Sequence, residues 1–297
     1  MLVDFHVHST ASDGTMAPSA LAERARRGGF AALALTDHDN CDGIAEFVKT
    51  GQTLFDKTED APRLTAGVEL SIEPGTGFDK FHLLGLGVDP ENAALKAFLR
   101  RVLEGRNARN RRIHANFARL GIEVAPEPHC EVLARPHYAK WLAAHGYARD
   151  IKDAFDKYLL PDSPAATRCY EERWHPPEAE AIGVIHAAGG LAVMAHPRYW
   201  KREWRMTGVD YAAAGRRLAE LKEMGLDGLE ALYAANTPEE DVEFTRLADR
   251  LGLLKSAGSD FHGTNKPEIA LGMEVGEAFI APLLERCVGV AGEKNHA

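Results

Sequence analysis

Short apolar runs alternate with amphipathic patterns along most of this 297-residue chain. A run such as Phe30–Leu35 is apolar at every position, which is typical of a strand buried on both faces of a sheet. The segments between such runs have the 3.6-residue apolar period of helices. Helices are expected at about 18–28, 177–188, 212–224 and 238–251. Strands that alternate with helices favour a parallel sheet, and about seven such units favour a barrel over an open sheet.

The stretch from about 92 to 176 interrupts this alternation, because its apolar residues keep helical spacing with no strand between them. We therefore predict a first barrel part (1–91), a helical insertion domain that caps the substrate (92–176) and a second barrel part (177–297). Residues 96–119 hold eight Lys or Arg residues against the single acid Glu104. Such a run either forms a solvated helix face or attracts a polyanionic substrate, and the pattern leaves both open.

Histidines and carboxylates recur at the predicted strands. The chain begins with a strand that contains His6 and His8, and the period of two residues places both on one face. Asp13 follows in a Ser-Asp-Gly turn, and later strands contain or end in residues of the same type. The candidate metal ligands are His6, His8, Asp13, His38, Glu69, His82, His196, Asp260 and His262. Active sites of α/β barrels lie at the carboxyl ends of the strands, where these residues are expected.

The chemistry of this set points to divalent cations. Nitrogen and carboxylate ligands without thiolates suit Mn²⁺, Zn²⁺, Fe²⁺ or Mg²⁺. Nine ligands are more than one ion needs, so two or three ions are implied. The four cysteines are scattered, which argues against a disulfide framework and favours a reducing cytoplasm. They are Cys41, Cys130, Cys169 and Cys287.

Charge and hydropathy exclude some classes of partner. The net charge of −9 disfavours binding to long duplex nucleic acid, which requires a basic surface. It does not exclude a small anion, because metal ions can reverse the local charge inside a site. We find neither a signal peptide nor a long apolar run that could span a membrane, and we expect a cytoplasmic protein.

Six motifs, in this order, resemble the polymerase and histidinol phosphatase (PHP) family. They are DFHVHSTASDG, TDHD, GVELS, FHLLGLG, AHP and SDFHG. The resemblance implies a distorted (β/α)7 barrel that hydrolyses phosphate esters with two or three divalent ions, of which Mn²⁺ is the expected one. It also implies three sets of metal ligands. They are His6, His8, Glu69 and Asp260; Glu69, His82 and His196, with Glu69 bridging the first two ions; and Asp13, His38 and His262. Neither the bridging by Glu69 nor the third ion follows from the spacing of the residues alone.

Two further segments resemble the branch of that family that acts on small nucleotides, which includes 3′,5′-nucleoside bisphosphate phosphatases and 5′-to-3′ exoribonucleases. They are Ala134-Arg-Pro-His-Tyr-Ala-Lys140 and Asn265-Lys-Pro267. The resemblance implies that Arg135 and His137 contact phosphate and act in catalysis, with protonated His137 or a water as proton donor. The alternative roles are an ion pair of the arginine with a surface acid and a capped helix start. Arg198, directly after Ala-His-Pro, is a further phosphate candidate.

The expected activity is therefore hydrolysis of the 3′-phosphate of a 3′,5′-nucleoside bisphosphate, through attack by a hydroxide that the metal ions activate. Four alternatives stay open: a 5′-3′ exoribonuclease on short RNA, a histidinol-phosphate phosphatase, a metal-dependent amide hydrolase and a non-catalytic metal-binding regulatory module. The expected partner is a small nucleotide or a short RNA, and the sequence does not indicate the oligomeric state.

Overall fold

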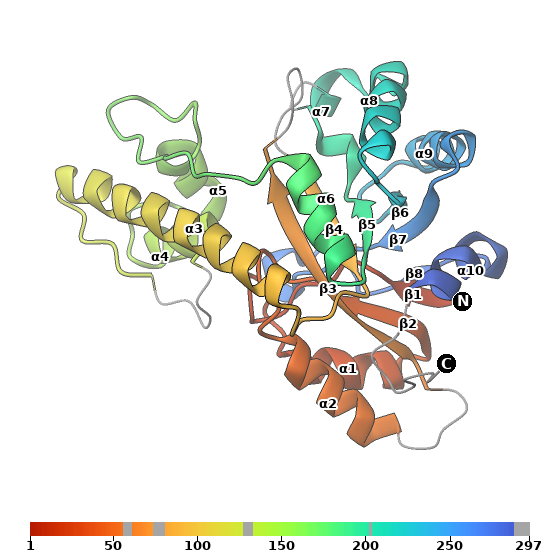
Figure 1. The fold of residues 1–297 in the computed structure, drawn as a ribbon. Coiled ribbons are helices and arrows are strands. Elements are labelled where there is room, and N and C mark those ends of the chain that lie inside the picture. Colours follow the sequence, from red (N-terminus) through yellow and green to blue (C-terminus); the bar gives the residue numbers. More distant parts are fainter. Residues whose placement is uncertain (56–60, 74–80, 127–132, 202–203, 288–297) are drawn as a thin grey trace. The chain divides into compact units, whose positions relative to one another are not determined.

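The fold is described from a computed structural model (Figure 1), in which the described residues are 1–55, 61–73, 81–126, 133–201 and 204–287. Cys130 lies outside these ranges, and the other three cysteines are free thiols. The chain forms two compact units. Unit 1 contains residues 1–98 and 176–297, and unit 2 contains residues 99–175. No helix among the described residues is long and apolar enough to cross a membrane.

Unit 1 is built on one mixed sheet that curls into a nearly closed barrel, which confirms the predicted α/β class. The strands lie in the order β7-β6-β5-β4-β3-β2-β1-β8. They are β1 (Leu2–Asp4), β2 (Phe30–Leu35), β3 (Arg63–Ile72), β4 (Phe81–Leu86), β5 (Leu191–Met194), β6 (Gly228–Tyr233), β7 (Leu254–Gly258) and β8 (Met273–Glu274). Seven of them were expected, whereas the two-residue β8, antiparallel to β1, was not.

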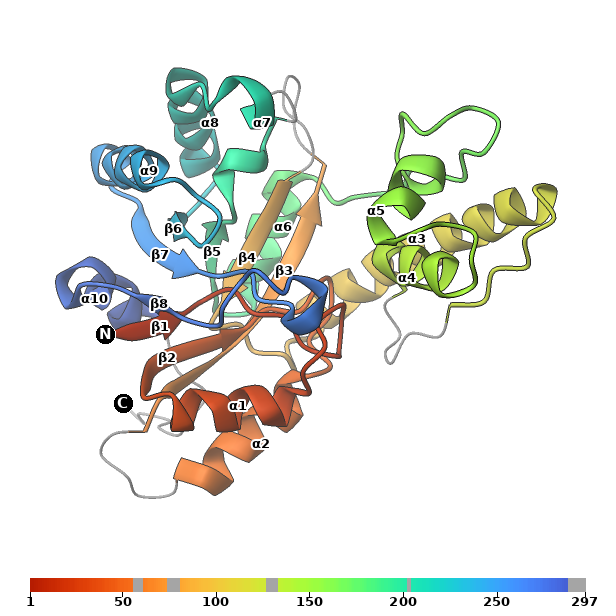
Figure 2. The ribbon, with the colours of Figure 1, turned by 180° about the vertical axis from the view of Figure 1, so that it is seen from behind.

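The segments after β1 and β7 lie side by side and close the barrel (Figure 2). Phe5 N–H donates to Ala257 O at 2.9 Å, and Asp260 N–H donates to His6 O at 2.9 Å. Val7 pairs in parallel with Phe261. This pairing brings the first His-x-His segment against the Asp-x-His segment near the other end of the chain.

The direction of β4 corrects the expectation of a parallel sheet. β4 is antiparallel to both β3 and β5, while β2 and β3 pair in parallel, as do β5, β6 and β7. His82 is the second residue of β4, opposite Ser71 near the end of β3. Because the strand is reversed, its beginning lies at the edge where its neighbours end. His82 therefore reaches the same edge as the other candidates.

The barrel core extends to both faces of the early strands. Ala32 and Ala34 of β2 belong to one buried cluster with Val3 and Phe5. Leu33 and Leu35 belong to a second, which packs under two helices. The apolar run of β2 is thus buried on both faces, as its composition predicts.

Seven α-helices lie entirely within unit 1 among its described residues. They are α1 (Pro18–Arg27), α2 (Ile44–Phe55), α6 (Glu178–Ala187), α7 (Trp204–Thr207), α8 (Tyr211–Glu223), α9 (Pro238–Leu251) and α10 (Glu277–Arg286). The four expected at 18–28, 177–188, 212–224 and 238–251 agree with the structure to within about two residues, whereas α7 and α10 were not expected. At the start of α9, the Thr237 hydroxyl accepts Glu240 N–H at 3.2 Å and the Glu240 carboxylate accepts Thr237 N–H at 2.8 Å. This reciprocal pair is a capping box.

Unit 2 is helical in its described part. It contains most of α3 (Ala93–Arg119), then α4 (Arg135–Ala144), α5 (Ile151–Ala154) and a π-helical turn (Phe155–Leu159). Its own core includes Ile113, Phe117 and Tyr138, each 0% exposed. Unit 2 therefore has a packed interior of its own.

Candidate metal centre

The structure brings all nine candidate ligands together at one edge of the barrel. Their nitrogen and oxygen atoms form four groups, within each of which the ligand atoms lie within 4.8 Å of one another. The groups are His8, Asp13, His38 and His262; His6, His8 and Asp260; His6, Glu69 and His196; and His38, Glu69 and His82. The sequence analysis selected these nine residues. His6, His8 and His38 each belong to two of the four groups, whereas the expected ligand sets placed each of them at one ion.

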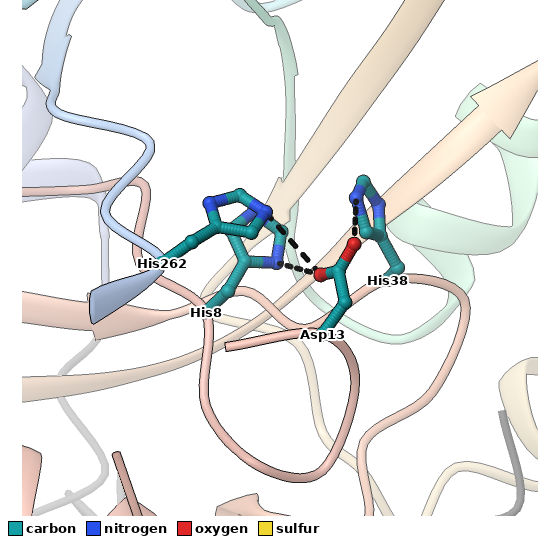
Figure 3. Close-up of side chains that lie close together, drawn as sticks. All are labelled: His8, Asp13, His38 and His262. Carbon is teal, nitrogen blue, oxygen red and sulfur yellow. Dashed lines mark ion pairs between the residues drawn. The ribbon is translucent and has the colours of Figure 1, made fainter. Parts of the chain in front are cut away.

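Asp13 lies at the centre of the first group (Figure 3). Its Oδ1 atom is 3.2 Å from His262 Nε2 and 3.9 Å from His8 Nδ1, and its Oδ2 atom is 3.8 Å from His38 Nε2. Burial would raise the pKa of Asp13, but His38, His262 and His8 hold it well below its usual range. The carboxylate is therefore ionised and available to a cation.

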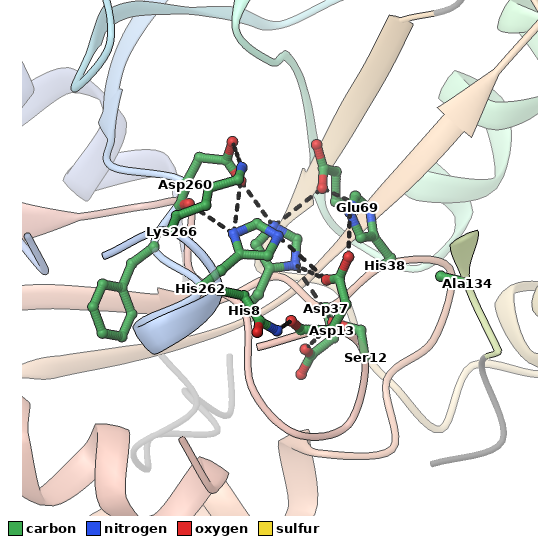
Figure 4. A network of polar contacts seen from close by, with 12 residues as sticks. His8, Ser12, Asp13, Asp37, His38, Glu69, Ala134, Asp260, His262 and Lys266 are labelled. Atoms are coloured by element: carbon green, nitrogen blue, oxygen red, sulfur yellow. Dashed lines mark hydrogen bonds and ion pairs between the residues drawn. The ribbon is translucent and has the colours of Figure 1, made fainter. Parts of the chain in front are cut away.

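Glu69 belongs to two of the other groups. It is 0% exposed, and its Oε1 atom lies 2.7 Å from His82 Nδ1 and 3.0 Å from His196 Nε2. Its Oε2 atom lies 2.8 Å from His38 Nδ1 (Figure 4). Burial would raise the pKa of Glu69, but His38, His82 and His6 hold it well below its usual range. A buried, ionised carboxylate between several imidazoles has the geometry of a bridging ligand.

Several buried atoms of the cluster have no hydrogen-bond partner among the described residues. They are His6 Nε2, His8 Nε2, Asp13 Oδ1, His38 Nδ1 and Glu69 Oε2. A buried polar atom without a partner costs free energy, so such atoms are normally satisfied. Imidazole nitrogens and carboxylate oxygens that converge in this way fit divalent cations.

Glu230 of β6 forms hydrogen bonds with two of the candidate ligands, His6 and His196. The sequence analysis missed this residue. It is 0% exposed, and its Oε1 atom is 2.9 Å from His6 Nδ1. Its Oε2 atom accepts His196 N–H at 2.6 Å. An ionised carboxylate only accepts, so His6 carries its proton on Nδ1 and leaves Nε2 for a cation. The available signal was an acid inside an otherwise apolar strand.

A β-bulge in β6 adds a second supporting side chain. The register with β7 shifts between Glu230 and Leu232, so Tyr233 comes to lie on the same face as Glu230. The Tyr233 hydroxyl donates to Asp260 Oδ2 at 3.0 Å. Lys266 Nζ contacts the same oxygen at 2.5 Å, as Figure 4 shows. Asp260 thus keeps its Oδ1 atom for the histidines, 3.3 Å from His8 Nε2.

The two acids that flank His38 act on the backbone around the site. Asp37 accepts Ser9 N–H at 2.8 Å and the Ser9 hydroxyl at 2.6 Å, and it also accepts the Ser12 hydroxyl. It therefore holds the turn that leads to Asp13. Asp39 accepts Ser71 N–H at 3.1 Å, which ties this loop to the end of β3.

Backbone strain also concentrates at the cluster. The non-glycine residues with positive φ among those described are Asp39 (54°), His196 (26°) and Asp260 (58°). Two are candidate ligands and the third follows His38 directly. Such conformations cost about 1–3 kcal/mol each and are typical of functional sites.

The candidate phosphate contacts have other partners in this structure. In unit 2, Arg135 Nη1 donates to Leu159 O at 3.4 Å, and its guanidinium lies 5.4 Å from the Tyr170 ring centre. His137 Nδ1 accepts Ala134 N–H at 3.0 Å, which caps the start of α4. In unit 1, Arg198 Nη1 is 3.2 Å from Glu240 Oε2. One contact of His137 is therefore the helix-capping role that the sequence analysis gave as the alternative to phosphate binding.

Comparison with known proteins identifies the family. The PHP domain matches residues 4–159, more than half of the chain. The chain belongs to the PHP family. A PHP relative, the 3′,5′-nucleoside bisphosphate phosphatase of Chromobacterium violaceum, is 34% identical over 267 residues, which are 88% of this chain and 87% of the relative. The 5′-3′ exoribonuclease Rnm of Salmonella typhimurium is 32% identical over 88% of this chain and 85% of its own length.

A solved structure agrees with the PHP assignment. A protein of Bifidobacterium adolescentis described as a metal-dependent phosphoesterase has a TM-score of 0.77 and 27% identity, with 98% of each chain covered. With the cluster of nitrogen and carboxylate ligands, these matches identify this PHP chain as a metal-dependent phosphoric ester hydrolase that binds divalent metals.

Proposed function

We propose that this protein is a phosphatase that removes the 3′-phosphate from 3′,5′-nucleoside bisphosphates. The observation that supports this most is the 34% identity, over 88% of the chain, to a phosphatase named for that substrate. The nine-residue cluster supports it chemically, since hydrolysis of a phosphate monoester has a very high uncatalysed barrier. Several cations held in one site are suited to lowering such a barrier.

We assign the ligands to three cation positions. The first is formed by His6, His8, Glu69 and Asp260, the second by Glu69, His82 and His196, and the third by Asp13, His38 and His262. The bridging position of Glu69 is supported by its Oε1 atom, which lies 2.7 Å from His82 Nδ1 and 3.0 Å from His196 Nε2. Divalent cations supply Lewis acidity and lower the pKa of water to about 7. Mn²⁺ is our proposal for the ion.

The side chains of the protein do the positioning. Glu230 fixes the tautomer of His6, and Tyr233 and Lys266 orient Asp260, so the ligand atoms are aimed before substrate binds. We propose that Arg135 and His137 bind phosphate oxygens. Because His137 Nδ1 accepts a backbone N–H, the neutral ring has its proton on Nε2, which can donate a hydrogen bond to a phosphate oxygen. The proton for the leaving oxygen would come from a protonated His137 or from a water. Arg198 is a further proposed phosphate contact, which would share its charge between Glu240 and the substrate.

Exonuclease activity on short RNA is the second candidate, because the Salmonella relative of similar identity is a 5′-3′ exoribonuclease. The test compares kcat/KM for adenosine 3′,5′-bisphosphate, a 5′-phosphorylated tetraribonucleotide and histidinol phosphate, each with Mn²⁺. Our proposal predicts the highest value for the bisphosphate. A higher value for the RNA would replace it with the second candidate, and no turnover of either nucleotide substrate would refute both.

A further inference from the structure

Two side chains that are not proposed ligands contact Asp260, and both contact the same one of its two carboxylate oxygens. The Tyr233 hydroxyl donates to Asp260 Oδ2 at 3.0 Å, and Lys266 Nζ lies 2.5 Å from the same atom (Figure 4). We call Tyr233 and Lys266 the Asp260 clamp. Each oxygen of an ionised carboxylate has about two lone-pair sites, so two donors fill Oδ2.

The other oxygen of Asp260 faces the candidate ligands. Asp260 Oδ1 lies 3.3 Å from His8 Nε2 and 3.7 Å from His6 Nε2. Both of these nitrogen atoms are buried and have no hydrogen-bond partner among the described residues. The carboxylate therefore has one oxygen toward the first proposed cation position and one oxygen toward the Asp260 clamp.

Packing fixes the position of the Tyr233 hydroxyl. Tyr233 is only 4% exposed, and its ring meets the ring of Tyr199 edge to face, with 6.0 Å between the ring centres. The ring centre of His196 lies 5.8 Å from that of Tyr233. The β-bulge between Glu230 and Leu232 sets the face on which the side chain lies. The hydroxyl therefore has little freedom to leave Asp260.

The backbone that bears Lys266 is also tied to the site. Lys266 follows the short 3-10 helix Gly263–Asn265, and its N–H donates to Gly263 O at 3.2 Å. Asn265 Nδ2 donates to Asp13 O at 2.7 Å, so this segment is held against the loop of another candidate ligand. The Lys266 side chain is 35% exposed. Its replacement should therefore disturb the packing less than a change in the buried cluster.

The number of oxygens that one carboxylate gives to a cation affects which cation it prefers. Ca²⁺ takes about six to eight oxygen ligands and readily accepts both oxygens of one carboxylate. Cations that prefer octahedral coordination, such as Mn²⁺, need fewer oxygens. A carboxylate that can offer only one oxygen is therefore a greater disadvantage to Ca²⁺ than to Mn²⁺.

We propose that the Asp260 clamp restricts Asp260 to coordination through Oδ1 and thereby selects Mn²⁺ over Ca²⁺ at the first cation position. A cation that also takes Oδ2 has to displace two hydrogen bonds, one of them from a charged donor. This cost falls on Ca²⁺ and spares an ion that needs Oδ1 alone. The inference rests on the assignment of Asp260 to the first cation position, which is part of the proposed function, and not on the identity of the nucleotide.

The test compares the Mn²⁺ and Ca²⁺ affinities of the full-length protein without substrate. Protein loaded with Mn²⁺ is titrated with Ca²⁺, and electron paramagnetic resonance follows the Mn²⁺ that is released. Asp260→Ala identifies the Mn²⁺ that Asp260 holds. Tyr233→Phe removes one donor of the clamp and keeps the ring, and Lys266→Met removes the other donor and keeps most of the aliphatic chain.

Two control variants make the same chemical changes at other hydrogen bonds. Tyr158→Phe removes a hydroxyl that donates to Tyr147 O at 3.3 Å in unit 2. Lys255→Met removes an ammonium group that lies 2.6 Å from Asp249 Oδ1 in unit 1. Neither Asp249 nor Tyr147 is a candidate ligand, so both controls should keep the wild-type ratio of the Mn²⁺ affinity to the Ca²⁺ affinity.

Each clamp variant should lower this affinity ratio by about two- to tenfold, the range expected for one hydrogen bond, and the double variant should lower it further. A change of charge alone does not produce this result. Loss of the Lys266 charge raises the affinity for both ions by similar factors, because both are divalent, and leaves the ratio unchanged. Unchanged ratios in both clamp variants would overturn the proposal, and so would an equal fall in the controls.

A measurement on the wild type covers the case in which the clamp variants do not fold. In protein with ¹³C-labelled tyrosine, the Tyr233 hydroxyl proton should keep its hydrogen-bonded, downfield resonance when diamagnetic Zn²⁺ binds. Loss of this resonance on Zn²⁺ binding would show that Oδ2 leaves the clamp, which would overturn the proposal.

The outcomes separate this inference from the proposed function. Equal Mn²⁺ binding by Asp260→Ala and the wild type would refute the ligand assignment and this inference with it. Weaker binding by Asp260→Ala, with unchanged ratios in both clamp variants, would refute the inference alone. Because no substrate takes part, a preference for another nucleotide would refute the proposed function and leave this inference standing.

Discussion

Replacing Glu230 by Gln should weaken metal binding although Glu230 itself is not a proposed ligand. In the structure each Glu230 oxygen faces one donor, His6 Nδ1–H at 2.9 Å and His196 N–H at 2.6 Å. An amide has one oxygen and one NH₂ group, so in either orientation NH₂ faces one of these two donors. If it faces His6, the ring must move its proton to Nε2, the atom that would bind the cation.

The size of the effect follows from this conflict. Loss of a carboxylate that orients a histidine ligand typically costs about 10–100-fold in metal affinity, or about 1.4–2.7 kcal/mol. We expect the upper half of this range, because Glu230 and His6 are both 0% exposed and water cannot relieve the clash between donors.

The assay titrates metal-free protein with Mn²⁺ against a chelator of known affinity. The control is Glu223→Gln, which makes the same chemical change at an exposed position on α8. The reasoning would be refuted if Glu230→Gln bound Mn²⁺ within about twofold of the wild type while remaining folded.

Three further predictions concern other parts of the account. Asp13→Ala should reduce turnover to background with an unchanged far-ultraviolet circular dichroism spectrum, because Asp13 is the proposed carboxylate ligand of the third ion; normal rates would exclude that ion from the reaction. Phe117→Ala should lower the free energy of unfolding in urea by about 3–5 kcal/mol, because Phe117 is fully buried in the core of unit 2; a loss below about 1 kcal/mol would contradict this packing. Chelation should lower the free energy of unfolding by about 4 kcal/mol relative to protein at a free metal concentration of 1,000 times Kd; equal melting temperatures with and without chelator would argue against bound metal.

The sequence predicted most of unit 1 because its local patterns and its fold agree. Phe30–Leu35 is apolar throughout and forms β2, which is buried on both faces. The cluster was predicted because most of its ligands lie in a strand or just after one, and parallel strands bring such residues to one edge. His82 lies at the same edge because β4 is antiparallel to its neighbours. The apolar composition of a strand does not predict its direction in the sheet.

Other features depend on contacts between distant residues. Glu230 is one acid in a strand, and only the barrel places it 2.9 Å from His6, which is 224 residues away in the chain. The bulge that turns Tyr233 toward Asp260 is a mismatch between β6 and β7, which neither strand shows alone. In unit 2, the basic run 96–119 was open to two interpretations. Burial separates Arg109, at 4% exposed, from Arg112, whose side chain is 50% exposed.

The central claim is that the metal cluster removes one particular phosphate. The most direct test incubates adenosine 3′,5′-bisphosphate with the Mn²⁺-loaded protein and follows the products by ³¹P NMR. Our account predicts equal amounts of 5′-AMP and inorganic phosphate, and no reaction after chelation. Formation of 3′-AMP, or phosphate release that persists without metal, would contradict it.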